Sequence, residues 1–470
     1  MLAKTLAAVW LLLWGLAAAQ ELRDIQLEFG FANNIVANAW NPVQLRMRNQ
    51  PAAELIIDID QGSLLEGEQW LQYRRQLQGG SGLYIFEDVL YIPAWRSFTW
   101  TVRSNDVTLA SGSVDRRRVD SRPLTLLSAN DLGLYRELEP LDVRIVRLQN
   151  LQFLERSAAY DAVRHIILDG SSPPPRPQAL VAAAAGGVHI ALIEPLPESF
   201  AALRNVAASP EQRLAAGWFV RGSREDVLAG LLRLAPSTVT RHQLEQTLNS
   251  ADLAYRPSNI GQWIMLAIAA AYAALLLLLL RFGSLPGLFT SLVLALLCSA
   301  VAWLSLRPAD TLVMRTRSLH LGAGNLAQVL ELRSVFSLPA QEVNLPVAAF
   351  SLDSHGWRNQ ASSYDNSSMA LIMGRWSTLT LALRPRLDSA RLQWREGQLY
   401  NASNSALHDI YIIGQGWQGE RSLEADNTLA PSSSDSDHVP YRYHGLLSQF
   451  PAGTALARQG EQIHLAFAEP

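Results

Sequence analysis

Polar side chains follow three short apolar runs in the middle of the chain, at residues 124–127, 165–168 and 188–193. If these runs are parallel strands of one sheet, their carboxyl ends lie at the edge where open α/β sheets bind ligands. The candidate ligand-binding residues are therefore Asn130, Asp131, Asp169, Ser171, Ser172 and Glu194. The same residue types also favour turns and helix starts through local hydrogen bonds, so a purely structural role is the alternative.

No complete catalytic or metal-binding pattern accompanies these candidates. Cys298 is the only cysteine and lies within a long apolar run, and Lys4 is the only lysine. The rest of the chain therefore has no thiol nucleophile, thiolate metal ligand or Schiff-base lysine. Residues 322–327 match a dinucleotide-binding fingerprint loosely, but no βαβ unit surrounds them, and we expect a turn there. We predict no catalytic residue, no metal site and no cofactor.

The candidate residues belong to a predicted α/β domain over residues 122–255. Continuous apolar strands that alternate with helices are typical of a parallel, doubly wound sheet, here of the flavodoxin type. The pattern predicts helices at 179–185 and 224–234, and strands at residues 124–127, 143–146, 165–168, 188–193 and 217–220.

Strand patterns flank this domain on both sides. In residues 20–121 apolar and polar side chains alternate with period two, as at Leu55, Ile57 and Ile59, and turn-forming residues separate the strands. About seven strands of this kind in about 100 residues predict a β-sandwich of immunoglobulin-like architecture. Residues 307–470 return to strand patterning and predict a C-terminal β-rich domain.

Two regions are apolar enough to enter a lipid bilayer. Residues 1–19 combine one positive charge, an apolar stretch and the alanine run at 17–19, which together indicate a secretory signal peptide. Residues 260–280 and 282–306 could each span about 30 Å of hydrocarbon, and Gly283 and Pro286 favour a turn between them. The sequence therefore predicts a two-helix transmembrane hairpin over 260–306. The signal peptide places the soluble domains on the exported side of that membrane.

The composition is consistent with this arrangement. The length of 470 residues suggests two to four domains, since domains usually have about 100–200 residues. The 39 basic and 42 acidic residues give a net charge of −3, which argues against a nucleic-acid partner. Charged residues make up 17% of the chain, less than the roughly 25% of typical soluble domains, and this deficit favours a membrane protein.

Several short sequences point to one family. They are the segments at residues 41–45 (NPVQL), 91–93 (YIP), 180–193 with its Gly186-Gly187 helix stop, 396–401 (EGQLYN) and 407–411 (LHDIY). Together with the domain order, they make the chain resemble bacterial membrane-anchored envelope proteins that carry a degenerate domain similar to class I glutamine amidotransferases. The resemblance implies a place in the bacterial inner (cytoplasmic) membrane, with the soluble domains on the periplasmic or extracellular side. It also implies other envelope or inner-membrane proteins as partners, with a link to a MoxR-type ATPase system, and no assigned activity.

The amidotransferase pattern itself is incomplete in this chain. True members of that class place a cysteine on the tight turn between a strand and a helix. Here the strand at 188–193 leads into Glu194-Pro195-Leu196-Pro197, which contains no cysteine and cannot form that turn. The leading hypothesis is therefore a non-enzymatic membrane-anchored protein that binds or assembles an envelope complex. The alternative is an exported hydrolase or ligand sensor that uses the strand ends of the α/β domain.

Overall fold

The computed structural model describes most of the chain outside its N-terminus and its central apolar region. The described residues are 25–60, 70–92, 97–128, 133–138, 143–147, 156–171, 177–201, 203, 209–214, 216–234, 241–250, 312–337, 341–345, 349–355, 360–365, 368–373, 377–417, 422–431, 450 and 452–467.

The N-terminal part is a two-layer β-sandwich. One sheet contains β1 (Ile25–Phe29), β3 (Ala39–Arg48) and β6 (Leu83–Ile92). The other contains β5 (Trp70–Leu77), β4 (Ala53–Asp60), β7 (Phe98–Ser104) and β8 (Val107–Val114). Strand alternation buries Leu45, Leu55 and Ile57 completely between the layers. Phe29 and Phe98 pack edge to face in this core, with ring centroids 4.8 Å apart.

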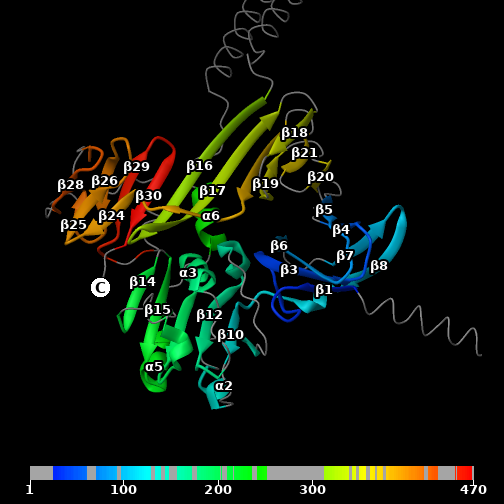
Figure 1. Ribbon diagram of the computed structural model, residues 1–470. Coiled ribbons are helices and arrows are strands. Elements are labelled where there is room, and N and C mark those ends of the chain that lie inside the picture. Colours follow the sequence, from blue (N-terminus) through cyan, green and yellow to red (C-terminus); the bar gives the residue numbers. More distant parts are fainter. Residues whose placement is uncertain are drawn as a thin grey trace, which may run out of the picture.

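Three strands from much later in the chain extend the second of these sheets. They are β18 (Gln341–Leu345), β21 (Ser368–Met373) and β20 (Gln360–Asp365), in the order β18-β21-β20-β5-β4-β7-β8. β20 runs parallel to β5, and Ser363 is the register partner of Gln72. Figure 1 shows these yellow strands beside the blue ones of the sandwich. One continuous sheet therefore joins the N-terminal and C-terminal parts of the chain.

A mixed sheet follows the sandwich in the sequence. A short parallel pair leads into it: β2 (Ile35–Val36) with β9 (Val119–Asp120), which follows the 3-10 turn η1 (Arg116–Arg118). The sheet has the order β11-β10-β12-β13-β15-β14, in which only β14 is antiparallel. Its five parallel strands coincide closely with the runs expected from the sequence, and their order is that of flavodoxin-type sheets. The strands are β10 (Leu124–Ser128), β11 (Arg144–Arg147), β12 (Val163–Leu168), β13 (His189–Ile193), β14 (Glu211–Leu214) and β15 (Gly217–Gly222).

Helices cover both faces of this sheet. Leu180 of α3 (Pro177–Ala185) packs on one face, in the same apolar cluster as Ile166 and Ile190. Leu134 of α2 (Gly133–Leu138) and Leu231 of α5 (Arg224–Leu234) pack on the other. The remaining helical elements of this region are η3 (Ser157–Tyr160), η4 (Glu198–Phe200) and α6 (Arg241–Ser250).

Gly217 allows β15 to pass close to the backbone at the end of α3. A Cβ atom at this position would lie 2.3 Å from the carbonyl oxygens of both Ala184 and Val188. Gly217→Ala is therefore expected to lower the free energy of unfolding by about 3 kcal/mol, because neither oxygen can move without shifting its strand or helix. Urea unfolding measures the effect. Gly80→Ala is the control, since a Cβ there meets nothing within 4 Å, and equal losses for both variants would contradict the packing described.

A nine-stranded sheet dominates the C-terminal part. Its longest element is the antiparallel hairpin of β16 (Leu312–Ala323) and β17 (Leu326–Ser337), whose turn is Gly324-Asn325. The turn expected within residues 322–327 is thus the turn of this hairpin. The sheet also contains β19 (Ala349–His355), β22 (Ser377–Leu383), β23 (Arg386–Ser389), β26 (His408–Ile412), β27 (Gly416–Trp417), β29 (Ala455–Gln459) and β30 (Gln462–Ala466). A smaller sheet consists of β24 (Leu392–Arg395), β25 (Gln398–Asn401) and β28 (Thr428–Leu429).

The predicted fold class, a multidomain β and α/β membrane protein, is wrong. The described residues are mostly β-sheet, with 58% in strands and 16% helical, and they include only four α-helices. The longest of these, α5, has 11 residues, which reach about half of the 30 Å of a bilayer's hydrocarbon core. Accordingly, none of the described helices is long and apolar enough to cross a membrane. The hairpin predicted at 260–306 and the signal peptide predicted at 1–19 lie outside the described residues.

Candidate functional site

The strand-end residues predicted from the sequence make local contacts where the structure describes them. Asp169 Oδ1 accepts a hydrogen bond of 2.9 Å from the backbone N–H of Ser171, as in a side-chain-stabilised turn. Glu194 Oε1 lies 3.3 Å from Nε of Arg221. The loop after β12 lies directly against the loop after β13. A Cβ atom added to Gly170 would lie only 2.4 Å from Pro197 Cδ. Asn130, Asp131 and Ser172 lie outside the described residues.

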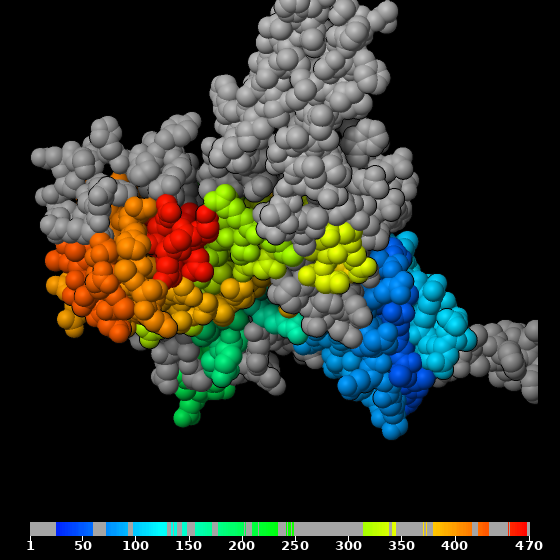
Figure 2. Space-filling model, turned by 90° about the horizontal axis from the view of Figure 1, so that it is seen from above, coloured from blue at the N-terminus to red at the C-terminus, as the bar shows by residue number. Residues whose placement is uncertain are grey.

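Charged side chains instead gather where the sandwich meets the mixed sheet. They form three clusters, centred on Asp120, Asp161 and Asp88, which we call the junction. Figure 2 shows the surrounding parts from above, with the blue sandwich on one side and the orange and red C-terminal strands on the other. Each cluster joins residues that are far apart in the sequence.

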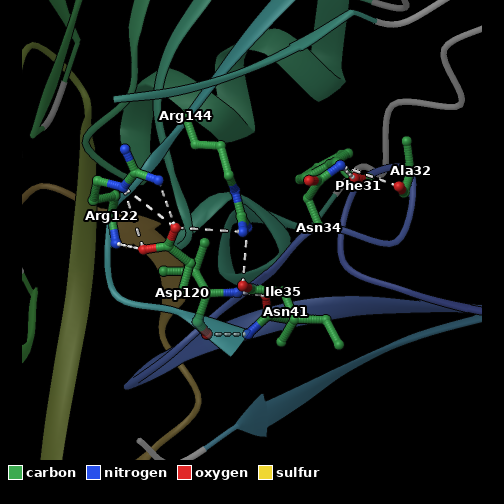
Figure 3. A network of polar contacts seen from close by, with 9 residues as sticks. Phe31, Ala32, Asn34, Ile35, Asn41, Asp120, Arg122 and Arg144 are labelled. Atoms are coloured by element: carbon green, nitrogen blue, oxygen red, sulfur yellow. Dashed lines mark hydrogen bonds and ion pairs between the residues drawn. The ribbon is translucent and has the colours of Figure 1, made fainter. Parts of the chain in front are cut away.

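The first cluster fixes the chain segment that leaves the sandwich. Asp120 accepts hydrogen bonds of 2.9 Å from the backbone N–H and the Nη2 of Arg122. Arg144 of β11 reaches back, with Nη1 3.8 Å from Asp120 and Nη2 donating to the carbonyl of Ile35 at 2.9 Å. Figure 3 shows Asp120 between the two arginines. The hydrogen bonds from Arg122 hold the pKa of Asp120 below its ordinary value, so the carboxylate stays charged at neutral pH.

The second cluster is buried between β3 and α6. Asp161 accepts hydrogen bonds from the backbone N–H of Trp40 at 2.8 Å and from Nε of Arg241 at 2.7 Å. Arg241 also pairs with Glu245, one helical turn further along α6. The side chain of Glu245 is fully buried, and its Oε1 has no hydrogen-bond partner among the described residues. Burial raises the pKa of Glu245 to about 7, despite the opposing charge of Arg241.

The third cluster brings together arginines from three parts of the chain around Asp88 of β6. Arg75 of β5 donates to Oδ2 at 2.9 Å, and Arg156, just before η3, donates to Oδ1 at 2.7 Å. Arg384, just after β22, donates to the same Oδ1 at 3.2 Å. Burial alone would raise the pKa of Asp88, but Arg75 and further hydrogen bonds outweigh it, so the pKa lies below the ordinary value. This one carboxylate therefore ties the sandwich, the mixed sheet and the C-terminal sheet together.

Two pairs of buried histidines lie on adjacent parallel strands. His165 of β12 faces His189 of β13 with ring centroids 5.6 Å apart, and His320 of β16 faces His464 of β30 at 4.4 Å. Burial lowers the pKa of His189 and His464 to about 3 and that of His320 to about 4, and these rings are neutral at pH 7. Within the part of the chain that the structure describes, no three side chains of the metal-binding types His, Cys, Asp and Glu gather.

Reasoning from the sequence missed the junction, although one signal was present. Along β6, Tyr84, Phe86, Leu90 and Ile92 share the alternation that points into the sandwich, and Asp88 occupies the same series. Arg75 interrupts the corresponding series of β5 in the same way. A charged residue in a core-facing position demands a buried partner, because an isolated buried charge is costly. The alternation therefore marks Asp88 and Arg75 as a buried pair, but not the distant Arg156 and Arg384.

The chain matches no model of a known protein family, and no curated protein is similar enough to count as a relative.

Proposed function

We propose that the protein acts by binding and assembly rather than by catalysis, as an exported component of the bacterial cell envelope. The observation that carries the proposal is the cluster around Asp88, to which three separate parts of the chain each contribute an arginine. Such a cluster holds the sheets in one fixed arrangement, and a pre-organised surface binds partners with a smaller loss of conformational entropy. The proposal does not depend on a membrane anchor.

Free strand edges support a binding role. Among the described strands, β6 pairs only with β3 and ends its sheet, and Leu83 and Ile85 at its start are 57% and 37% exposed. β8 ends the other sheet of the sandwich, where Val107 is 62% exposed. Exposed edge strands with apolar side chains are surfaces to which partner strands add. The sandwich therefore offers two such edges that the described residues leave unpaired.

The alternative function, a hydrolase or ligand sensor at the strand ends, has less support. It requires Asp169 and Glu194 to face a ligand, and both carboxylates are engaged in local contacts. If this alternative is right, Asp169→Ala abolishes activity in a hydrolase screen without lowering the melting temperature. If the binding role is right, the same variant leaves partner binding unchanged.

Crosslinked co-purification of the full chain from its native cells tests the proposal. We expect a defined set of envelope proteins with the wild type, and loss of that set when Leu83→Asp and Val107→Asp alter both strand edges. The control is Leu232→Asp, since Leu232 on α5 is also exposed but lies away from both edges. An identical set of partners with the edge variant, at an unchanged melting temperature, would contradict the proposal.

A further inference from the structure

The carboxylate of Asp88 is fully occupied by donors. Oδ2 accepts from the Tyr73 hydroxyl at 2.7 Å as well as from Arg75, and Oδ1 accepts from the Val89 N–H at 2.8 Å as well as from Arg156 and Arg384. A carboxylate offers about four lone-pair positions, so these five donors saturate it. Asp88 thus cannot satisfy the remaining N–H groups of its arginines.

The cluster carries more positive than negative charge. Arg75 and Asp88 are both buried, with side chains 5% and 6% exposed, and they neutralise each other. Arg156 and Arg384 are additional, and each uses only Nη1 on Asp88. Among the ion pairs of the described residues, neither has a second carboxylate. Within the described part of the chain, two guanidinium groups are therefore held around one oxygen atom with no further carboxylate paired to them.

Both surplus arginines reach solvent. The side chain of Arg156 is 51% exposed and that of Arg384 is 32% exposed, whereas the Asp88 that holds them is buried. A guanidinium has five N–H donors in a planar fork, which matches the oxygens of phosphate or carboxylate. Because the two forks come from different parts of the chain, they can bind different oxygens of the same tetrahedral anion, which offers more acceptor oxygens than a carboxylate.

We infer that Arg156 and Arg384 form a binding site for a phosphoryl group, either inorganic phosphate or a phosphomonoester. Asp88 and Arg75 act as positioning residues that hold the two guanidinium groups from the buried side. The inference rests on the proposed binding function and specifies the chemistry of a ligand for it. It places this ligand at the junction, away from the strand ends that the sequence indicated.

Isothermal titration calorimetry of the purified full chain with sodium phosphate at constant ionic strength tests the site. We expect saturable binding to the wild type, and at least tenfold weaker binding after Arg156→Gln with Arg384→Gln. Arg116→Gln with Arg117→Gln is the control, because these exposed residues of η1 give the same change in net charge without converging on a buried carboxylate. The control is expected to bind phosphate like the wild type.

Further variants separate the site from general attraction to positive charge. Arg156→Lys with Arg384→Lys keeps the charge but removes the planar fork, and is expected to weaken binding as well. Glycerol phosphate in place of phosphate distinguishes a phosphomonoester from the free ion, and acetate should bind far more weakly than either. Absent or non-saturable binding to the wild type, or equal weakening by the control, would overturn the inference. Partner co-purification is a separate readout, so either proposal can fail without the other.

Discussion

Arg241→Met is expected to lower the free energy of unfolding by about 4 kcal/mol. The substitution keeps much of the side-chain volume but leaves Asp161 and Glu245 buried without their shared cation. Removing one partner of a buried ion pair typically costs about 3–5 kcal/mol, because the remaining charge stays in a poorly solvated place. The pKa of Glu245, which burial already raises to about 7, should rise further in this variant.

Urea unfolding at pH 7.5 measures this effect. Arg233→Met is the matched control, since Arg233 also pairs with a glutamate, Glu211, but is 63% exposed. Exposed pairs of this kind contribute up to about 1 kcal/mol. Adding Glu245→Gln to Arg241→Met should recover part of the lost free energy, because it removes one of the two buried carboxylates that have lost their cation. A loss of less than about 1 kcal/mol for Arg241→Met would show that the second cluster does not hold the junction together.

Acidification from pH 7.5 to 5.5 is expected to destabilise the protein by about 3 kcal/mol. His165, His189, His320 and His464 all have pKa values lowered by burial, so the unfolded chain binds protons that the folded chain does not. The free energy of unfolding is therefore greatest above pH 6.5, the ordinary pKa of histidine. It decreases as the pH falls from there towards the folded-state pKa values. Each histidine contributes up to about 1.4 kcal/mol per pH unit in that window.

Glu245 opposes this trend in part of the same range. Its folded-state pKa is raised, so the folded chain binds the extra proton between about pH 4.5 and 7, and its contribution to stability is lost as the pH rises. Each histidine contributes about 1.4 kcal/mol to the difference in stability between pH 7.5 and 5.5, so replacing His320 and His464 by asparagine should remove most of the net difference. His408→Asn is the control, because His408 is exposed. A stability that does not change on acidification would contradict the burial of these rings.

Local patterns predicted the strands of the mixed sheet, because parallel strands buried on both faces are continuous apolar runs. The alternation at Leu55, Ile57 and Ile59 likewise predicted a half-buried strand, which is β4. Both signals come from neighbouring residues and need no knowledge of the rest of the chain. The alternation of predicted helices and strands nevertheless overestimated the helical content. Helices α2 and α3 have only 6 and 9 residues, and the described residues are mostly β-sheet.

Long-range pairings could not be predicted in this way. Nothing in the local sequence of residues 360–365 indicates that β20 pairs with β5, which lies almost 300 residues earlier in the chain. For the same reason Arg156 and Arg384 looked like ordinary surface arginines, since only the folded chain brings them to Asp88. The strand-end candidates, by contrast, followed a rule for where parallel sheets bind ligands. That rule cannot tell whether an Asp such as Asp169 closes its own turn or faces a ligand.

The central claim is that distant parts of this chain form one body, and crosslinking across the joined sheet tests it most directly. In a Cys298→Ser background, Gln72→Cys and Ser363→Cys place thiols on register partners of β5 and β20, on strands about 4.8 Å apart. A short bifunctional thiol reagent should link them rapidly. The control pair is Gln76→Cys with Ser363→Cys, in which the thiol on β5 lies about 13 Å further along the strand. This pair should react far more slowly. Equal rates for both pairs, or no link in either, would contradict the account.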